Sequence, residues 1–369
     1  MSIKSIFTSE PTVDLALSDI KGQLTGFDVR MLLFFASCDA YAPDSISAGM
    51  SSAFPDAAVF GCSSHAELYN GKTLHGSLTA MAFDNGTIGD VRIEVLENLG
   101  GGINVAPVFK AFDEHFKTSM SSVDYHEYGG IILVDGLSMK EEDVMDKIGS
   151  HTNITFTGGS SSDALKFEKT YLYYSGKVYS DAAILAVFKT VRGLDFIKTQ
   201  SVEITDTVFE ITKSDTGRRA VLELDGKPAV KRYSEVLGVP PSEVGPLLFA
   251  NPVGLVIDDD VFIRSCQRVD GDALIFYCNM LEGTTINLLK IKDIIPDTRA
   301  AVEDKLKDLG SVEGIIDFRC VLRTIQLGEE DNTEDYAVIF EGIPSIGFST
   351  YGEQYLGHIN QTSMMLVFR

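Results

Sequence analysis

The chain has 369 residues, of which 44% are hydrophobic, and its formal net charge is −22 at pH 7. This length and apolar content are typical of two folded domains rather than a single core. The acidic charge would repel both a nucleic-acid backbone and an anionic membrane, so we expect neither as a partner. No apolar run approaches the roughly 20 residues that a membrane-spanning helix needs.

The first predicted elements alternate between strands and helices. Met31–Ala36, Pro43–Phe54 and Ala57–Phe60 read as a strand, a helix and a strand, which implies a parallel pair of strands. Leu78–Phe83 and Val91–Leu96 then alternate in polarity and predict antiparallel strands.

The same order then recurs. A helix, a strand, a helix, a strand and a hairpin are predicted over Asn104–Phe116, Gly130–Val134, Glu141–Gly149, Ile154–Phe156, and Tyr171–Tyr174 with Val178–Phe188. Polar strands and turns follow over residues 193–219, and we place a domain boundary there, giving domains of residues 1–210 and 211–369.

The second half mixes both kinds of element. It is predicted to contain a strand, a helix, a meander of strands, a second helix and a further strand over Val221–Leu224, Val230–Leu237, Leu247–Leu289, Pro296–Leu309 and Gly314–Leu322. Asp331–Phe340 fits a helix or a strand. The predicted fold class is therefore α/β with mixed, α+β-like sheets, in two domains built from repeated strand–helix–strand–turn–strand modules.

Three copies of one turn organise this pattern. Gly61–Gly71 and Gly347–Gly357 both read Gly-x-Ser-(Ser/Thr)-x-x-Glu-x-Tyr-x-Gly, and Gly158–Asp163 is a partial third copy. Each copy follows a short apolar strand. An internal repeat of this kind predicts a pseudo-symmetric assembly, which would bring the three turns toward a shared cleft.

Such turns have a clear binding chemistry. A glycine and serine turn at the end of a buried strand can expose backbone N–H groups to a carboxylate or phosphate, and nearby glutamates could accept from an ammonium group. We therefore predict a site for a zwitterion such as an amino-acid-like metabolite. The candidate ligand-binding residues are Ser63, Ser64, Glu67, Ser160, Ser161, Asp163, Tyr351, Glu353, Asn360 and Thr362.

A structural interpretation competes with this one. The spacing from Ser64 to Glu67, and from Thr350 to Glu353, also fits a helix capping box, and the residues alone leave the two interpretations open. Three arginines pose a similar choice, because they lie on predicted strands where a charge needs a partner. We expect them to pair with acidic residues, with anion binding as the alternative; they are Arg264, Arg319 and Arg323.

The cysteines predict the compartment. They number five, an odd count without the spacing of a disulfide framework or zinc motif, which indicates free thiols and a cytoplasmic location. Cys266 and Cys278 flank a predicted hairpin turn. Two buried strand thiols are the preferred interpretation, and a redox pair stays open.

The motifs also resemble a known family. Four stretches are similar to the N- and C-terminal parts of the FIST family of bacterial signal-transduction sensors. They are Gly61–Glu67, Gly158–Asp163 with 169–181, Leu222–Ala229, and Tyr351–Glu353 with 360–362. The resemblance implies a non-catalytic sensor that binds a small molecule and acts on a signalling partner such as a histidine kinase. A homo-oligomer stays open.

Two alternatives remain. Some members of the FIST family are implicated in haem-based nitric oxide sensing through a histidine kinase, so the resemblance keeps haem b open as a cofactor, with His358 as the first candidate axial ligand and His65 as the second. An enzyme that uses Cys62 or a glutamate is the other alternative. The sequence has no nucleophile elbow, phosphate-binding loop or paired Cys-x-x-Cys motif to support it.

Overall fold

The computed structural model describes residues 2–258 and 260–369, and the chain divides into two compact units. Unit 1 takes the chain up to Thr199 together with Thr298–His358 and Ser363–Arg369; unit 2 takes Gln200–Asp297 and Ile359–Thr362. Unit 2 is thus an insertion in the chain of unit 1. The predicted boundary between residues 210 and 211 concerns the two sequence domains and stays a prediction.

Unit 1 consists of three repeats with the same order of elements, apart from one additional helix in repeat 3. Repeat 1 is β1 (Ile3–Thr8), α1 (Val13–Gln23), β2 (Met31–Ser37), α2 (Pro43–Ala53), β3 (Ala58–Ser64), β4 (Glu67–Tyr69), β5 (Lys72–Leu74) and β6 (Leu78–Phe83). Repeat 2 is β7 (Ile88–Glu97), α3 (Ala106–Phe116), β8 (Tyr128–Val134), α4 (Glu141–Gly149), β9 (Phe156–Ser160), β10 (Leu172–Tyr174), β11 (Lys177–Tyr179) and β12 (Ala182–Thr190).

Repeat 3 is interrupted by the insertion. It is β13 (Leu194–Thr199), α6 (Ile294–Leu309), β22 (Gly314–Cys320), α7 (Val321–Glu329), α8 (Thr333–Ile339), β23 (Ser345–Thr350), β24 (Glu353–Tyr355), β25 (His358–Ile359) and β26 (Ser363–Phe368). The predicted modules are therefore present three times, each preceded by a further strand and helix.

Each repeat contributes to a six-stranded sheet, and the strand orders are equivalent. They are β1-β6-β2-β3-β10-β11, β7-β12-β8-β9-β24-β25 and β13-β26-β22-β23-β4-β5. In every sheet the second strand is antiparallel to the first and to the third, and the third and fourth strands are parallel.

The last two strands of each sheet come from another repeat. The hairpin β4-β5 of repeat 1 joins β23 of repeat 3, β10-β11 of repeat 2 joins β3 of repeat 1, and β24-β25 of repeat 3 joins β9 of repeat 2. The exchange is cyclic. It places the turn between each parallel strand and its hairpin at the meeting point of the repeats.

The repeated glycine explains why the motif begins as it does. Gly61, Gly158 and Gly347 occupy equivalent places in the parallel strand pairs. A Cβ atom at these glycines would lie 1.9, 1.7 and 1.9 Å from the carbonyl oxygen of the facing strand. Only glycine allows the two backbones to approach this closely.

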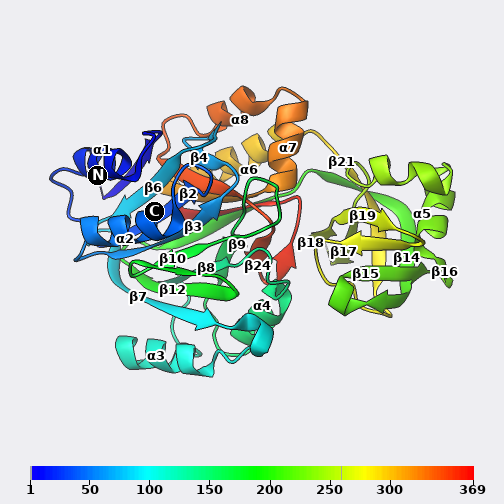
Figure 1. The fold of residues 1–369 in the computed structure, drawn as a ribbon, viewed down its shortest axis with the longest axis horizontal. Helices are drawn as coiled ribbons and strands as arrows, with labels where there is room; N and C mark the ends of the chain where they lie inside the picture. The colour runs from blue at the N-terminus through cyan, green and yellow to red at the C-terminus, as the bar shows by residue number, and fades with distance from the viewer. Residues whose placement is uncertain (1, 259) are drawn as a thin grey trace. The chain divides into compact units, whose positions relative to one another are not determined.

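The helices cover their own sheets. In repeat 1, α1 and α2 lie side by side against the strands (Figure 1) and contribute Ala16, Ile20, Ile46 and Met50 to its core. Pro43 at the first position of α2 fits this helix start, because its missing N–H would have no partner there. Repeat 2 has a corresponding core beneath α3 and α4.

Unit 2 is a separate sheet with one helix. Its elements are β14 (Val202–Asp215), β15 (Ala220–Leu224), β16 (Lys227–Pro228), α5 (Ala229–Leu237), β17 (Val253–Ile257), β18 (Asp260–Arg264), β19 (Cys266–Asp270), β20 (Ala273–Phe276) and β21 (Thr285–Ile291). The strand order is β18-β17-β21-β14-β15-β20-β19, with β16 beside β15. Tyr233 of α5 and Phe209 of β14 belong to its core, and Gly238 ends the helix in the left-handed conformation.

Several predicted elements need correction. The strand predicted to reach residue 322 ends at Cys320, and α7 begins at Val321, so Arg323 lies on a helix. The undecided segment near residue 335 forms α8. The strands predicted at 78–83 and 91–96 are both antiparallel to their partners, but β6 and β7 belong to different sheets.

The two cysteines near the predicted hairpin turn are buried thiols, and neither is in a disulfide. Cys266 faces Phe276 across the β19-β20 ladder, and Cys278 lies beyond the end of β20. The ladder begins with Asp270 facing Ala273, a register that already excludes a Cys266–Cys278 pair, and the bulge between Cys266 and Arg268 shifts Cys266 one residue further.

Candidate functional site

The three glycine and serine turns meet in unit 1, and Ser162 connects them. Its side-chain hydroxyl donates to the carbonyl of Ser349 (2.6 Å) and accepts from the backbone N–H of His65 (2.8 Å). Its carbonyl accepts from the hydroxyl of Ser63 (2.9 Å). The predicted convergence of the turns is therefore confirmed, and we call this meeting point the hub.

The backbone N–H groups of the hub are paired. The three equivalent serines each donate to a carbonyl of the next repeat, in the pairs Ser63 to Tyr171 (2.9 Å), Ser160 to Gly352 (2.9 Å) and Ser349 to Ala66 (2.8 Å). The turn hydrogen bonds thus close a ring through all three repeats. In this structure these N–H groups hold the repeats together rather than facing an open cleft.

The serine hydroxyls are also engaged. Ser161 donates to the carbonyl of Val134 (3.2 Å), and Ser160 lies between the carboxylate of Glu141 (3.4 Å) and the amide of Gln354 (3.0 Å). All of these serines are buried. A buried hydroxyl without a partner would be costly, so this network stabilises the hub.

Two glutamates occupy equivalent positions at the start of the exchanged hairpins. Glu67 accepts from the hydroxyl of Ser64 (2.5 Å) and from the hydroxyl (2.8 Å) and N–H (3.1 Å) of Ser77. Glu353 accepts from the hydroxyl of Thr350. Both carboxylates are fully buried.

These contacts answer the capping question. In a capping box each of the two side chains bonds to a backbone N–H. Here the hydroxyls of Ser64 and Thr350 donate directly to the glutamate carboxylates, and each glutamate begins a strand, β4 or β24, rather than lying in a helix. Burial raises the pKa of Glu67 to about 7, against the lowering effect of the bonds from Ser64 and Ser77.

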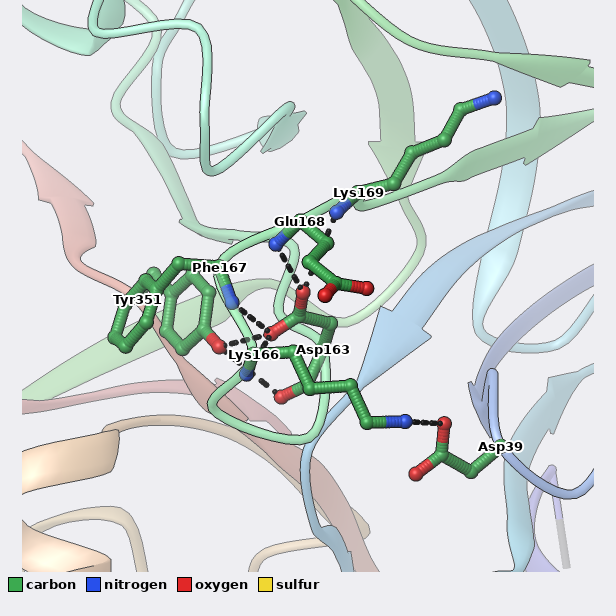
Figure 2. A network of polar contacts seen from close by, with 7 residues as sticks. All are labelled: Asp39, Asp163, Lys166, Phe167, Glu168, Lys169 and Tyr351. Atoms are coloured by element: carbon green, nitrogen blue, oxygen red, sulfur yellow. Dashed lines mark hydrogen bonds and ion pairs between the residues drawn. The ribbon is translucent and has the colours of Figure 1, made fainter.

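Repeat 2 differs in this region. Leu172 takes the position of the two glutamates, and the turn before it is longer by a loop over residues 163–170. Figure 2 shows the Asp163 carboxylate at the centre of this loop. It accepts four backbone N–H groups, from Lys166 (3.0 Å), Phe167 (3.1 Å), Glu168 (2.9 Å) and Lys169 (3.3 Å).

Tyr351 joins this loop to repeat 3. Its hydroxyl donates to the Asp163 carboxylate, and its ring stacks on Phe167 with centroids 4.8 Å apart. Burial acts to raise the pKa of Asp163, but hydrogen bonds from Tyr351 and from the loop N–H groups outweigh this effect, and the pKa is lowered. The ionised carboxylate therefore fixes the loop, and Lys166 extends from it to an ion pair with Asp39 (2.7 Å).

Two buried arginines lie beside the third turn. Arg319 of β22 is completely buried; its Nη2 donates to Thr73 (2.7 Å) and its Nε to Thr324 (3.2 Å). Thr324 in turn accepts from the hydroxyl of Ser349 (2.9 Å), which connects Arg319 to the hub. The hairpin exchange explains the contact with Thr73, because it brings β5 of repeat 1 onto the sheet of repeat 3.

Arg323 of α7 is 2% exposed, and its Nη2 donates to Thr298 (2.9 Å) and Thr199 (3.3 Å). Burial lowers its pKa. Asp317 lies near both guanidinium groups and accepts from Tyr336 (3.1 Å) and Ser363 (2.5 Å). We expected Arg319 and Arg323 to pair with acidic residues; the hydrogen bonds found for their guanidinium groups go to threonine hydroxyls instead.

Comparison with known proteins decides the family. The FIST N domain matches residues 30–227, and the FIST C domain matches residues 229–356. The chain belongs to the FIST family. FIST domains are sensor domains of signal transduction.

One curated relative is itself without an assigned function. It is the uncharacterized protein MJ1623 of Methanocaldococcus jannaschii, which is 28% identical over 204 residues. The match covers 51% of this chain and 39% of the relative, so the FIST chain spans well under half of that protein's length.

The two histidines proposed as haem ligands have different surroundings. Nδ1 of His358 lies 3.1 Å from the amide nitrogen of Gln354, and the ring packs directly against Gly352, where a Cβ would come within 2.0 Å. Haem needs a flat apolar pocket beside its axial ligand. The neighbours found for His358 are polar and close, so they do not fit a porphyrin in this structure.

His65 is half-buried on the first turn, and its ring lies edge-on to His75 with centroids 5.5 Å apart. Burial lowers the pKa of His65, which favours the neutral imidazole. Cys62, three residues earlier, is completely buried, and burial raises the pKa of its thiol well above the ordinary value. A nucleophilic thiol needs a lowered pKa, so the surroundings of Cys62 work against that role.

The remaining predicted residues belong to unit 2. The backbone N–H of Asn360 donates to the carbonyl of Ile263 (3.3 Å). The side-chain carbonyl of Asn360 accepts from the backbone N–H of Ser265 (3.4 Å). The Thr362 hydroxyl donates to the carbonyl of Asn360 (2.8 Å). Both residues therefore fix the course of the 359–362 segment.

Sequence reasoning overlooked the side chains that complete the hub. Ser162 was visible only as a third consecutive serine, and Gln354 and Thr324 lie outside the shared part of the motif. Their partners lie 187, 194 and 25 residues away in the chain. No local spacing could have indicated such contacts.

No helix in the part of the chain that the structure describes is both long enough and apolar enough to cross a membrane.

Proposed function

We propose that this FIST protein is a non-catalytic sensor that binds a small, amino-acid-like molecule next to the hub and regulates a signalling partner such as a histidine kinase. Membership of a sensor family supports the general role. The small ligand and its partner are our inference from the chemistry of the hub.

One observation carries the proposal. Charged and polar side chains, among them Glu67, Glu353 and Arg319, are buried together where three repeats meet. Filling such a position with apolar residues would stabilise a purely structural junction better, because buried charges cost several kcal/mol each. A ligand that carries both an ammonium and a carboxylate group would use these side chains directly.

The Glu353→Gln variant tests this proposal. Glu353 is expected to accept from the ligand's ammonium group, and losing a charged hydrogen bond of about 1.5–3 kcal/mol weakens binding by about tenfold to a hundredfold. A panel of amino acids would first be screened by thermal shift, because a ligand that binds only the folded state raises the melting temperature. Affinities would then be measured by calorimetry.

The control is Glu341→Gln, at an exposed position of the same repeat, which should bind like the wild type. If Glu353→Gln lowers the melting temperature without ligand and leaves the affinity unchanged, the glutamate is structural. If no amino acid binds and none co-purifies with the protein, the proposal itself fails. A Soret band after incubation with hemin would instead favour the haem alternative.

A further inference from the structure

Arg319 and Arg323 are buried positive charges with unused hydrogen-bonding capacity. Nη1 of Arg319 and Nε of Arg323 are both buried and have no hydrogen-bond partner among residues 2–258 and 260–369. Within the same residues, neither guanidinium forms an ion pair with a carboxylate within 4 Å.

This arrangement is unusual for a folded protein. A buried guanidinium is normally matched by a carboxylate, because an uncompensated buried charge strongly destabilises the fold. Here the compensation comes from threonine hydroxyls and from the ring face of Tyr336, whose centroid lies 4.8 Å from the guanidinium carbon of Arg319. Hydroxyl groups and an aromatic face are weaker partners than a carboxylate.

The two arginines also lie in one neighbourhood. Arg319 and Arg323 sit on either side of the junction between β22 and α7, and each is near enough to Asp317 to affect its pKa. The charge of Glu353, at the start of the exchanged hairpin β24-β25, also affects the pKa of Arg323. The two arginines are therefore close to the carboxyl groups of Asp317 and Glu353 beside the hub.

We propose that Arg319 and Arg323 form the subsite that binds the carboxylate group of the sensed molecule. The inference rests on the proposed function, of which it names the recognition chemistry. The planar guanidinium fork matches a carboxylate, and two forks supply more donors than one such group requires.

Burial also predicts how the ligand enters. Because Arg319 is 0% exposed and Arg323 is 2% exposed, a ligand reaches them only when the surrounding structure opens. Association that requires a conformational change is slower than ordinary docking, for which rate constants are about 10⁵–10⁷ M⁻¹s⁻¹. A bound carboxylate would then be held in a site of low dielectric, where its charged hydrogen bonds are strong.

The test uses acetate and malonate as probes on the full chain, labelled with ¹⁵N-arginine. The Nε–H signals of the arginines would be followed by NMR during titration and assigned with Arg319→Lys and Arg323→Lys. We expect saturable shifts of both signals. Arg319→Gln should weaken acetate binding by about tenfold to a hundredfold, the loss expected for a charged hydrogen bond. Arg92→Gln, at a surface ion pair with Glu94, is the matched control and should bind like the wild type.

The outcomes separate this inference from the function on which it rests. If neither arginine signal responds to acetate or malonate, the subsite is wrong, even where an amino acid binds elsewhere on the protein. If inorganic phosphate shifts both signals at lower concentration than acetate does, the carboxylate assignment is overturned. If acetate binds as expected while no amino acid does, the subsite stands and the proposed function fails. Should Arg319→Gln not fold, Arg323→Gln and the wild-type titration give the same answers.

Discussion

At the scale of single residues, Glu67 shows how burial makes a candidate ligand-binding carboxyl group sensitive to pH. It lies at the start of β4 and is held by Ser64 and Ser77. Its pKa of about 7 means that the folded protein binds this proton more tightly than the unfolded chain, where the ordinary value is 4.5. The protein is therefore most stable when Glu67 is protonated.

We predict a loss of stability as the pH rises from about 4.5 to 7. The contribution of protonated Glu67 is complete below the unfolded-state pKa, and it disappears as the pH passes the folded-state pKa. Since one pKa unit corresponds to about 1.4 kcal/mol, the total loss is about 3 kcal/mol. Urea denaturation at a series of pH values would measure it as the difference between the wild type and Glu67→Gln.

A control with an exposed acid separates this effect from general charge repulsion. Glu97 is exposed, so Glu97→Gln should follow the wild-type pH curve. If the wild type and Glu67→Gln give parallel curves between pH 4.5 and 7, Glu67 does not titrate as proposed.

Residue-level sequence reasoning predicted the chemistry of the hub but not its geometry. The serines and glutamates of the motif were identified, but the direct bond between the Ser64 hydroxyl and the Glu67 carboxylate was not. The role of Glu67 was left open because the three-residue spacing also fits a capping box. Only the exchange of hairpins, a tertiary event, decides that a strand follows Glu67.

At the scale of elements, the loop over residues 163–170 depends on one carboxylate. Leu165 and Phe167 adopt left-handed backbone conformations, with φ of 59° and 53°, which cost roughly 1–2 kcal/mol each for bulky side chains. Asp163 offsets this strain by accepting four N–H groups of the loop. The other two repeats have shorter turns and no such device.

We predict that Asp163→Ala opens this loop to trypsin after Lys166 and Lys169, both of which are exposed. Leaving several N–H groups without an acceptor costs about 1–3 kcal/mol each, and a loss of even 2 kcal/mol raises the open population by roughly 30-fold. Mass spectrometry of timed digests would give the cleavage rates.

Cleavage after Lys147, on helix α4, is the internal control and should keep its rate. Tyr351→Phe removes one hydroxyl and keeps the ring that stacks on Phe167, so it should increase cleavage less than Asp163→Ala does. Equal cleavage of the wild type and Asp163→Ala would show that the loop is held by something else.

At the scale of the whole chain, the cyclic exchange of hairpins is the central feature of unit 1. The sequence predicted the repeat, since the glycine at each close approach of two strands is visible as a motif. It did not predict the exchange, because a three-residue strand such as β4 carries no sign of which sheet it joins. Nor could periodicity show that residues 200–297 interrupt repeat 3, because both parts consist of ordinary strands and helices.

The interruption leads to the last prediction. Thr199, at the end of β13, and Thr298, in α6, both accept from the same nitrogen of Arg323, at 3.3 and 2.9 Å, so the two ends of the insertion are close together. A Gly/Ser linker of about four residues can span such a gap, because an extended chain covers up to about 3.5 Å per residue. We expect a chain with Thr199 joined in this way to Thr298 to keep the three six-stranded sheets of unit 1.

The shortened chain should unfold cooperatively, with a urea m-value reduced by about a quarter, because the m-value scales with the surface exposed on unfolding. Residues 359–362 lose their partners Ile263 and Ser265 and should exchange amide hydrogens faster, while Ser349 and Ser63 in the hub remain protected. Hydrogen exchange with mass spectrometry measures both regions in one experiment. A hub that loses protection along with residues 359–362 would show that the three repeats cannot close without the inserted unit.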